Sequence, residues 1–335
     1  MVLSGEVQEV GPGCWAWMRA PGGWGQTNIG LVTGRDGALL IDTPWDHRLC
    51  AAMLDAFAPM LDDRPVSLLV NTHADGDHWW GNAVVSGAEV LASATTAAAM
   101  REEPGPGEMV AMRRLARAIG AVPGRAGRMG RYVAAMLGPF AFDEVTPRVP
   151  DRTFTGQRVE TAGGRQVLLI DHGPAHTRSD AIVVVPDARV VYAGDLLFAR
   201  TTPLMWHGPV AAWLAALEAI MALEADVFVP GHGPVSTRTE LRALHEYWSW
   251  LSAAVTAHRE AGRNASEATR RLARSPEFAA FRSWENPERL AINVISIDRQ
   301  LRGEGPILAS PLARARAFHA VAGLASELER AARRD

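Results

Sequence analysis

Short apolar runs recur along the first two thirds of the chain, and almost every run leads directly into a polar cluster. Five such runs, rich in leucine and β-branched residues, lie at 38–41, 68–70, 167–170, 190–192 and 227–229. Short apolar runs bounded by turn residues are typical of buried β-strands. Polar groups that follow several strands can meet at one rim of a sheet, so we expect a functional site at that rim.

Helical periodicity separates these strands. Apolar residues recur every three to four positions from Leu49 to Met60 and again from Trp213 to Met221, as on the buried face of an α-helix. A helical insertion is predicted at about residues 95–145, and an α-helical C-terminal extension at residues 240–335. The pattern therefore predicts an α/β domain over residues 1–239, which carries the insertion, followed by the helical extension.

Composition excludes several classes of function. The 335 residues carry 34 basic and 37 acidic side chains, a net charge of −3, so nucleic acid is not an expected partner. Every basic residue is arginine, which excludes lysine Schiff-base chemistry and a P-loop lysine. The two cysteines, Cys14 and Cys50, form no C-x-x-C pair, so neither a thiolate zinc site nor a disulfide framework is expected.

The N-terminal segment gives the expectation for location. Residues 1–10 lack a positively charged start and a continuous apolar stretch, the two marks of a secretory signal. No apolar run approaches the ~20 residues of a spanning helix. A cytoplasmic protein with no membrane partner is predicted.

The most informative stretch is Asn71–Asn82, which follows a predicted strand. Four candidate metal ligands lie within six positions: His73, Asp75, Asp77 and His78. Alternate residues of an extended loop point the same way, and His78 can then turn toward a second centre. Imidazole with carboxylate suits zinc, iron or manganese, whereas calcium prefers oxygen alone. An Asp-rich turn with solvated histidines is the alternative.

Three further candidates lie at predicted strand ends beside glycines, which permit tight turns: His176, Asp195 and His232. This ordered set, together with Asp42 at the end of its own strand, resembles the metallo-β-lactamase superfamily over about residues 25–235. The resemblance implies an α/β fold, the αββα metallo-β-lactamase sandwich, here with a helical insertion and an α-helical C-terminal extension. It also places the metals at one edge between two sheets.

The resemblance further implies a dinuclear metal centre with two divalent metal ions, zinc first, with iron or manganese as alternatives. Carried over residue by residue, the first site consists of His73, Asp75 and His176, the second of Asp77, His78 and His232, and Asp195 bridges the two. An aspartate at the bridge is similar to the glyoxalase II and lactonase branches of the superfamily.

One position departs from the family pattern. The usual motif is His-x-His-x-Asp-His, but Asp75 occupies the place of the second histidine. Diiron members of the superfamily also carry a carboxylate there. Three outcomes stay open at this stage: Asp75 binds a hard metal such as iron or manganese, it binds zinc less symmetrically, or it does not reach the metal.

The predicted activity is hydrolysis. A metal lowers the pKa of bound water from 15.7 toward ~7, and the resulting hydroxide would attack an ester, thioester or lactone of an apolar acyl or aromatic small molecule. Asp77 would both bind the metal and orient the nucleophile. The alternatives are a diiron oxygenase or oxidase of the same fold, a polyketide-type thioesterase or cyclase, and a metal-binding scaffold without catalysis.

Other residues have two interpretations each. Asp42 either holds a ligand histidine by a hydrogen bond or forms a strand-end turn, and His207 either contacts substrate or is a loop residue. The methionines of the insertion form an apolar wall for substrate or ordinary core. The arginines of the insertion either bind the phosphates of a substrate linked to coenzyme A or to a carrier protein, or they simply lie on a solvent-exposed helix face. A homo-oligomer is left open.

Overall fold

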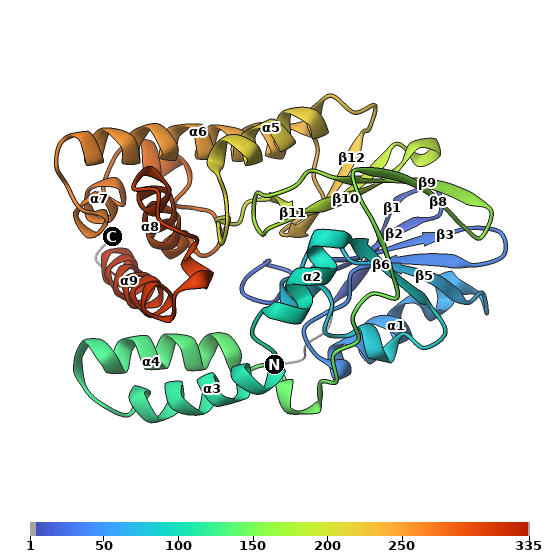
Figure 1. Ribbon diagram of the computed structural model, residues 1–335, viewed down its shortest axis with the longest axis horizontal. Coiled ribbons are helices and arrows are strands. Elements are labelled where there is room, and N and C mark those ends of the chain that lie inside the picture. The colour runs from blue at the N-terminus through green and yellow to red at the C-terminus, as the bar shows by residue number, and fades with distance from the viewer. Residues whose placement is uncertain (1–4, 334–335) are drawn as a thin grey trace.

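The computed structural model describes residues 5–333 and arranges them as two β-sheets packed face to face, with helices on the outer faces (Figure 1). The first sheet has seven strands in chain order: β1 (Glu6–Gly11), β2 (Cys14–Met18), β3 (Ile29–Thr33), β4 (Ala38–Ile41), β5 (Val66–Val70), β6 (Glu89–Ser93) and β7 (Arg152–Phe154). The second has the spatial order β12 (Val227–His232), β11 (Val190–Phe198), β10 (Ala181–Val185), β9 (Arg165–Asp171) and β8 (Gln157–Ala162).

Three apolar layers hold the sandwich together. Successive side chains of a strand point to opposite faces, and β4 shows this directly. Leu39 and Ile41 face the layer between the two sheets, whereas Leu40 packs in the layer between the first sheet and its helices. In the second sheet, Tyr192 faces the inner layer and Val191 the outer one. The order is therefore helix, sheet, sheet, helix, which confirms the predicted αββα fold.

Helices cover both outer faces. Asp46 begins α1 by accepting a hydrogen bond from the Leu49 amide, which satisfies one of the free donors of the first turn. The helices are α1 (His47–Leu61), α2 (Ala94–Glu102), α3 (Pro106–Gly120), α4 (Gly124–Leu137), α5 (Val210–Met221), α6 (Arg238–Glu260), α7 (Ala265–Leu272), α8 (Leu290–Leu301) and α9 (Pro311–Ala332). Among residues 5–333, none of these helices is long and apolar enough to cross a membrane.

The insertion and the C-terminal extension lie side by side at one end of the sandwich. Helices α3 and α4 form an antiparallel hairpin, and α4 packs against α9 of the extension (Figure 1). Both helical segments thus occur where the sequence predicts them. The outer layer of the second sheet runs without a break from Trp213 of α5 through Trp248 of α6 to Leu290 of α8. The division of the chain at residues 239 and 240 stays a prediction.

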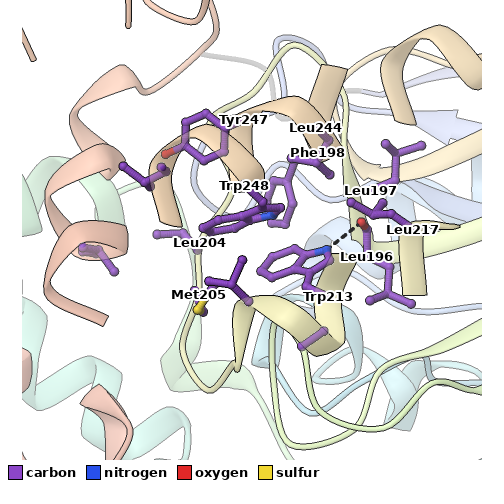
Figure 2. Close-up of a cluster of buried hydrophobic side chains, with 14 of the residues drawn as sticks. Leu196, Leu197, Phe198, Leu204, Met205, Trp213, Leu217, Leu244, Tyr247 and Trp248 are labelled. Carbon is purple, nitrogen blue, oxygen red and sulfur yellow. Dashed lines mark hydrogen bonds between the residues drawn. The ribbon is translucent and has the colours of Figure 1, made fainter. Parts of the chain in front are cut away.

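A buried aromatic cluster fixes the segment around Asp195. Figure 2 shows Trp213, Phe198 and Trp248 packed with leucines of β11 and α6. The indole of Trp213 donates a hydrogen bond to the Leu196 carbonyl over 3.0 Å, so the backbone directly after Asp195 is anchored. The pairing of β11 with β12 is irregular here, and Gly194 adopts a φ of +49°, a region that favours glycine. Asp195 thus belongs to β11 and lies at the point where the pairing of this strand with β12 is irregular.

Sequence patterning finds the strands that lead to the site and misses several others. The five predicted apolar runs fall in β4, β5, β9, β11 and β12. Seven strands were not predicted: β1, β2, β3, β6, β7, β8 and β10. Of these, β3 and β10 are apolar and almost fully buried, so their pattern resembles that of the predicted runs. In β1 and β8 half or more of the residues are partly or fully exposed, so they lack the continuous apolar run of a strand buried on both faces.

Candidate metal centre

The loop after β5 is held by its own hydrogen bonds. The side-chain amide of Asn71 donates to the His78 carbonyl over 2.9 Å, and the Trp79 indole donates to the Ala74 carbonyl over 2.7 Å. A short 3₁₀ turn, Gly76–His78, then reverses the chain. These contacts bring His73, Asp75, Asp77 and His78 to the same edge of the sandwich, as the spacing predicts.

Asp195 lies at the centre of four imidazoles. Its Oδ1 is 3.2 Å from the His78 Nε2. Its Oδ2 is 3.3 Å from the His176 Nε2, 3.4 Å from the His232 Nε2 and 3.9 Å from the His73 Nε2. All five side chains are buried. Although burial alone would raise it, the surrounding imidazoles hold the pKa of Asp195 well below its usual value, so this carboxyl is ionised.

Hydrogen bonds behind the cluster orient its imidazoles. The Asp42 carboxylate lies 2.8 Å from the His78 Nδ1 and accepts a hydrogen bond from the Thr72 hydroxyl over 2.7 Å, which in turn lies 2.9 Å from the His73 Nδ1. The His176 Nδ1 donates to the Leu204 carbonyl over 2.7 Å. With Nδ1 used in this way, the Nε2 atom of each ring is free to bind a metal. The position of Asp42 fits its predicted supporting role.

Asp75 reaches the cluster although its side chain is shorter than the histidine that the family has at this position. Its Oδ2 lies 3.0 Å from the His176 Nε2 and accepts a hydrogen bond from the Trp206 indole over 2.9 Å. Asp77 lies on the other side, where its Oδ2 is 3.6 Å from the His232 Nε2 and accepts a hydrogen bond from the Thr27 hydroxyl over 2.7 Å. Both carboxylates are therefore fixed by one neutral donor each.

The donor atoms form three groups, each with its atoms within 4.8 Å of one another: His73 with Asp75 and His176, Asp77 with His78 and His232, and His73 with His78 and Asp195. The first two groups match the two predicted sites, and the third contains the predicted bridge. Among residues 5–333, the buried atoms His73 Nε2, His78 Nε2 and Asp195 Oδ1 have no hydrogen-bond partner.

These unpartnered atoms fit metal ions. A buried polar atom without a partner is costly, and a cation would satisfy all three at once. Burial lowers the pKa of His73 well below its usual value, and the neighbouring His78 lowers it further. His73 is therefore neutral, which is the form that binds metals. Although burial alone would lower them, the nearby carboxylates raise the pKa of His78 and, to about 10, that of His176, so a metal ion would displace a proton from these two rings.

A cavity of about 450 Å³ opens on the cluster. Its wall is mainly apolar and comes from segments far apart in the sequence, among them the loop that carries Trp24, the α3–α4 hairpin, the segment with Leu204 and Trp206, and α9. The hairpin contributes Met109, Met112, Met129 and Met136 to this wall. The methionines of the insertion thus line the cavity beside the candidate metal ligands.

The structure places His207 outside the cavity and Glu103 on its wall. His207 is not among the residues that line the cavity, and its Nδ1 bonds the adjacent Gly208 carbonyl over 3.1 Å, so a contact with substrate stays a prediction without structural support. Glu103, which the sequence did not single out, does line the cavity. Burial and the nearby Asp75 raise the pKa of its carboxyl to about 8.

Sequence reasoning also missed three aromatic residues and an arginine. The rings of Trp24, Trp206 and Phe318 lie 6.0–6.5 Å apart, and all three line the cavity with Arg289. No motif marks them, because they come from a loop, a strand connection and the helical extension. Only their aromatic character, which favours pockets and interfaces, offered a signal.

The comparisons with known proteins agree with this geometry. A family model described as the metallo-beta-lactamase superfamily matches residues 22–232. The alpha subunit of 2,4-dinitroanisole O-demethylase from Nocardioides sp. is 22% identical over 230 residues, which are 66% of this chain and 57% of the relative. The hydroxyacylglutathione hydrolase of Brucella ovis is 33% identical over 96 residues, which are 29% of this chain and 37% of that protein. The chain thus spans about half or less of these relatives.

A solved structure has a similar fold over more of the chain. The stereoselective inverting sec-alkylsulfatase Pisa1 from Pseudomonas sp. superposes with a TM-score of 0.67 at 18% identity and covers 88% of this chain and 50% of that one. This share of the chain is larger than residues 1–239 provide, so the likeness extends into the C-terminal helices. At this identity the likeness concerns the fold alone.

Proposed function

Because the chain belongs to the metallo-beta-lactamase superfamily, we propose that it is a metal-dependent hydrolase that cleaves an ester, thioester or lactone bond in a small apolar acyl or aromatic substrate. The observation that carries this proposal is the apolar cavity that opens on the cluster of four histidines and three aspartates. Catalytic metal sites keep an open position for water and substrate, and this cavity provides access to one.

The residues fit two divalent metal ions, with zinc as the first choice and iron or manganese as alternatives. His73, Asp75 and His176 would hold one ion and Asp77, His78 and His232 the other, with Asp195 between them. Metal ions in such a site lower the pKa of water and polarise the carbonyl of the substrate. The three carboxylates leave a pair of divalent ions with a net charge of +1, which favours an anionic nucleophile.

The chain's own groups orient the reactants. Asp77 is the candidate catalytic residue, because its carboxylate lies at the mouth of the cluster and is fixed by Thr27. It would orient the attacking water by accepting a hydrogen bond from it. The Trp206 indole, which lines the same cavity, fixes Asp75 by donating a hydrogen bond to it. No serine or cysteine nucleophile is needed.

Three arginines of the insertion have different surroundings. Arg113 is bonded to the Phe140 carbonyl and to Asp143, so it is structural. Arg125 and Arg128 instead line a second cleft of about 1700 Å³ together with seven arginines of the C-terminal extension and only three carboxylates. The two hollows share Met129 and Ala315, so they adjoin. This charge supports a substrate linked to coenzyme A or to a phosphorylated carrier protein, as for a polyketide-type thioesterase or cyclase.

A comparison of two thioesters tests the carrier. The same acyl group would be offered on coenzyme A and on N-acetylcysteamine, which lacks the phosphates. We expect kcat/KM to favour coenzyme A by at least about tenfold, the effect of one charge-assisted contact. Arg128→Gln should reduce that ratio, and Arg189→Gln, which lies between β10 and β11 and lines neither hollow, should not. Equal rates for both thioesters would remove the carrier from the proposal.

An oxidative function is the second candidate, and Asp75 is the observation that favours it. A carboxylate beside His73 and His176 is a harder ligand than imidazole and suits iron. Elemental analysis of protein grown without added metal separates the two functions when it is combined with turnover of aryl ester, lactone and thioester panels and with dioxygen uptake. Zinc with ester turnover supports hydrolysis. Iron with dioxygen uptake and no hydrolysis would overturn it.

A further inference from the structure

A buried arginine faces the cavity from the C-terminal extension. Arg289 ends the 3₁₀ turn Pro287–Arg289 and precedes α8, and it lines the cavity that opens on the metal cluster. Only 1% of its surface is exposed. Its guanidinium lies over the Trp24 ring, 4.3 Å from the ring centroid, a cation–π contact that fixes the plane of the group.

The guanidinium of Arg289 has more donors than partners. One nitrogen, Nη1, donates to the Thr202 carbonyl over 3.1 Å, whereas the buried Nε has no partner among residues 5–333. No ion pair joins Arg289 to a carboxylate in the described part of the chain, although Glu288 is its neighbour in sequence. The Glu288 carboxylate instead accepts hydrogen bonds from the Tyr132 hydroxyl and the Asn286 amide.

This arrangement is costly without an anion. A buried charge is stable only when it is paired and its hydrogen bonds are satisfied. Burial lowers the pKa of Arg289, while Tyr132 and the carboxylates of Glu288, Asp195 and Asp77 raise it. Asp195 and Asp77 would themselves be neutralised by metal ions, because they belong to the donor groups. The Glu288 carboxylate remains nearby, but it is bonded to Tyr132 and Asn286, so among residues 5–333 no carboxylate forms an ion pair with the Arg289 guanidinium.

We propose that Arg289 binds an anionic group of the substrate, a carboxylate, sulfate or phosphate, while the apolar part of the same molecule lies against the methionine wall. The substrate is then an anionic amphiphile rather than a neutral ester. A guanidinium is suited to this role because its planar fork can donate two parallel hydrogen bonds to such a group. This inference rests on the proposed function, since it concerns the same cavity.

Binding can be measured without turnover. We would titrate the metal-loaded protein calorimetrically with decanesulfonate, decanoate and decylphosphonate, and with decanol as the neutral probe of equal chain length. We expect at least one anion to bind at least tenfold more tightly than decanol, and the preferred head group identifies the chemical class. Equal affinity for decanol and all three anions would overturn the inference.

Two variants separate Arg289 from the general attraction of metals for anions. Arg289→Gln should remove most of the anion preference and leave decanol binding unchanged. Arg314→Gln, a half-buried arginine of the same cavity wall, is the matched control and should keep the preference. If both variants, or neither, lose the preference, Arg289 is not the anchor.

Folding and hydrolysis serve as separate readouts. Arg289→Met keeps an apolar chain against Trp24, so it should fold even if Arg289→Gln does not. If both variants unfold, Arg289 is a structural cation and the inference is wrong. Hydrolysis of neutral decyl acetate tests the proposed function independently. The anionic ester monodecyl succinate is tested beside it. Turnover of either ester without any anion preference would overturn this inference and leave hydrolysis standing, whereas anion preference without turnover of either ester would do the reverse.

Discussion

The metal edge, meaning the seven candidate metal ligands with Asp42 behind them, and the wall of the cavity are built in opposite ways. The edge consists of mostly buried polar side chains at strand ends, and most of them are held by a hydrogen bond to a neighbour, such as Asp42 to His78. The wall consists of apolar side chains on helices, such as Met112 and Met136, which are only half-buried. The edge should tolerate few substitutions, because the hydrogen bonds of its polar atoms require narrow ranges of distance and angle. The wall can change shape because methionine is flexible.

This contrast separates reactivity from selectivity. On the proposed function, metal binding and water activation would depend on the edge, and the choice of substrate would depend on the wall and on Arg289. A substitution in the edge should therefore affect all substrates equally, and one in the wall should affect substrates of different length unequally. The following predictions test that separation.

The largest effect is expected for Asp195→Ala. Asp195 approaches all four imidazoles, so its loss would remove the carboxylate that we propose as the bridge and leave the histidines to repel one another once they are protonated. We expect loss of at least one metal by elemental analysis and a fall in kcat/KM of about 10³-fold or more, since metal-ion stabilisation contributes several kcal/mol. Asp187→Ala removes an exposed carboxylate paired with Arg165 and is the control. Retained metal content and activity would exclude a bridging role.

Asp75 gives the next effect and decides between the two candidate functions. Asp75→Ala should empty the site of His73 and His176 selectively and leave the other ion bound, because Asp77, His78 and His232 form their own group. Asp75→His should shift metal preference toward zinc, since imidazole is a softer ligand than carboxylate. Metal content at graded chelator concentration measures both. If Asp75→Ala binds two metals with unchanged affinity, Asp75 is not a ligand and the oxidative alternative loses its support.

A smaller effect is expected for Asp42→Asn. Asp42 adopts a φ of +65°, which asparagine tolerates, so the backbone should be retained. The change removes the charge that holds the His78 Nδ1 and, through Thr72, the His73 Nδ1. Loss of such a supporting contact typically costs 10–100-fold in metal affinity or activity, and we expect a value in that range for all substrates alike. A loss for one substrate class only would contradict the separation of edge from wall.

The sequence predicts the metal edge far better than the wall. His73, Asp75, Asp77 and His78 are close in sequence, and their strand supplies the geometry, so spacing alone brings them together. His176, Asp195 and His232 are distant, but glycines and strand ends mark each of them. The family and its αββα fold follow from this set and are confirmed.

The wall could be predicted only in part, for a physical reason. The methionine pattern indicates an apolar helix face, but its partner across the cavity depends on how α9 docks against α4, and docking of two helices leaves no local motif. Arg289 resembles any other arginine in a chain with 34 of them. Its burial and its missing partner appear only in the folded structure. The cytoplasmic location and the oligomeric state stay predictions.

The smallest effect, and the sharpest test of the wall, is expected for Met112→Ala and Met136→Ala. Both side chains line the cavity without being fully buried, so their loss should cost less stability than the 2–5 kcal/mol of a core methionine. The space gained should favour longer acyl chains, and one methylene in an apolar pocket is worth about 1–3 kcal/mol. We therefore expect the ratio of kcat/KM for a ten-carbon over a four-carbon ester to change by about tenfold, while metal content stays constant. Met60→Ala, a half-buried methionine of α1 outside the cavity, is the matched control and should leave the ratio unchanged. Equal losses for both esters in all three variants would reduce the methionines of the insertion to ordinary packing and make the wall, like the edge, indifferent to chain length.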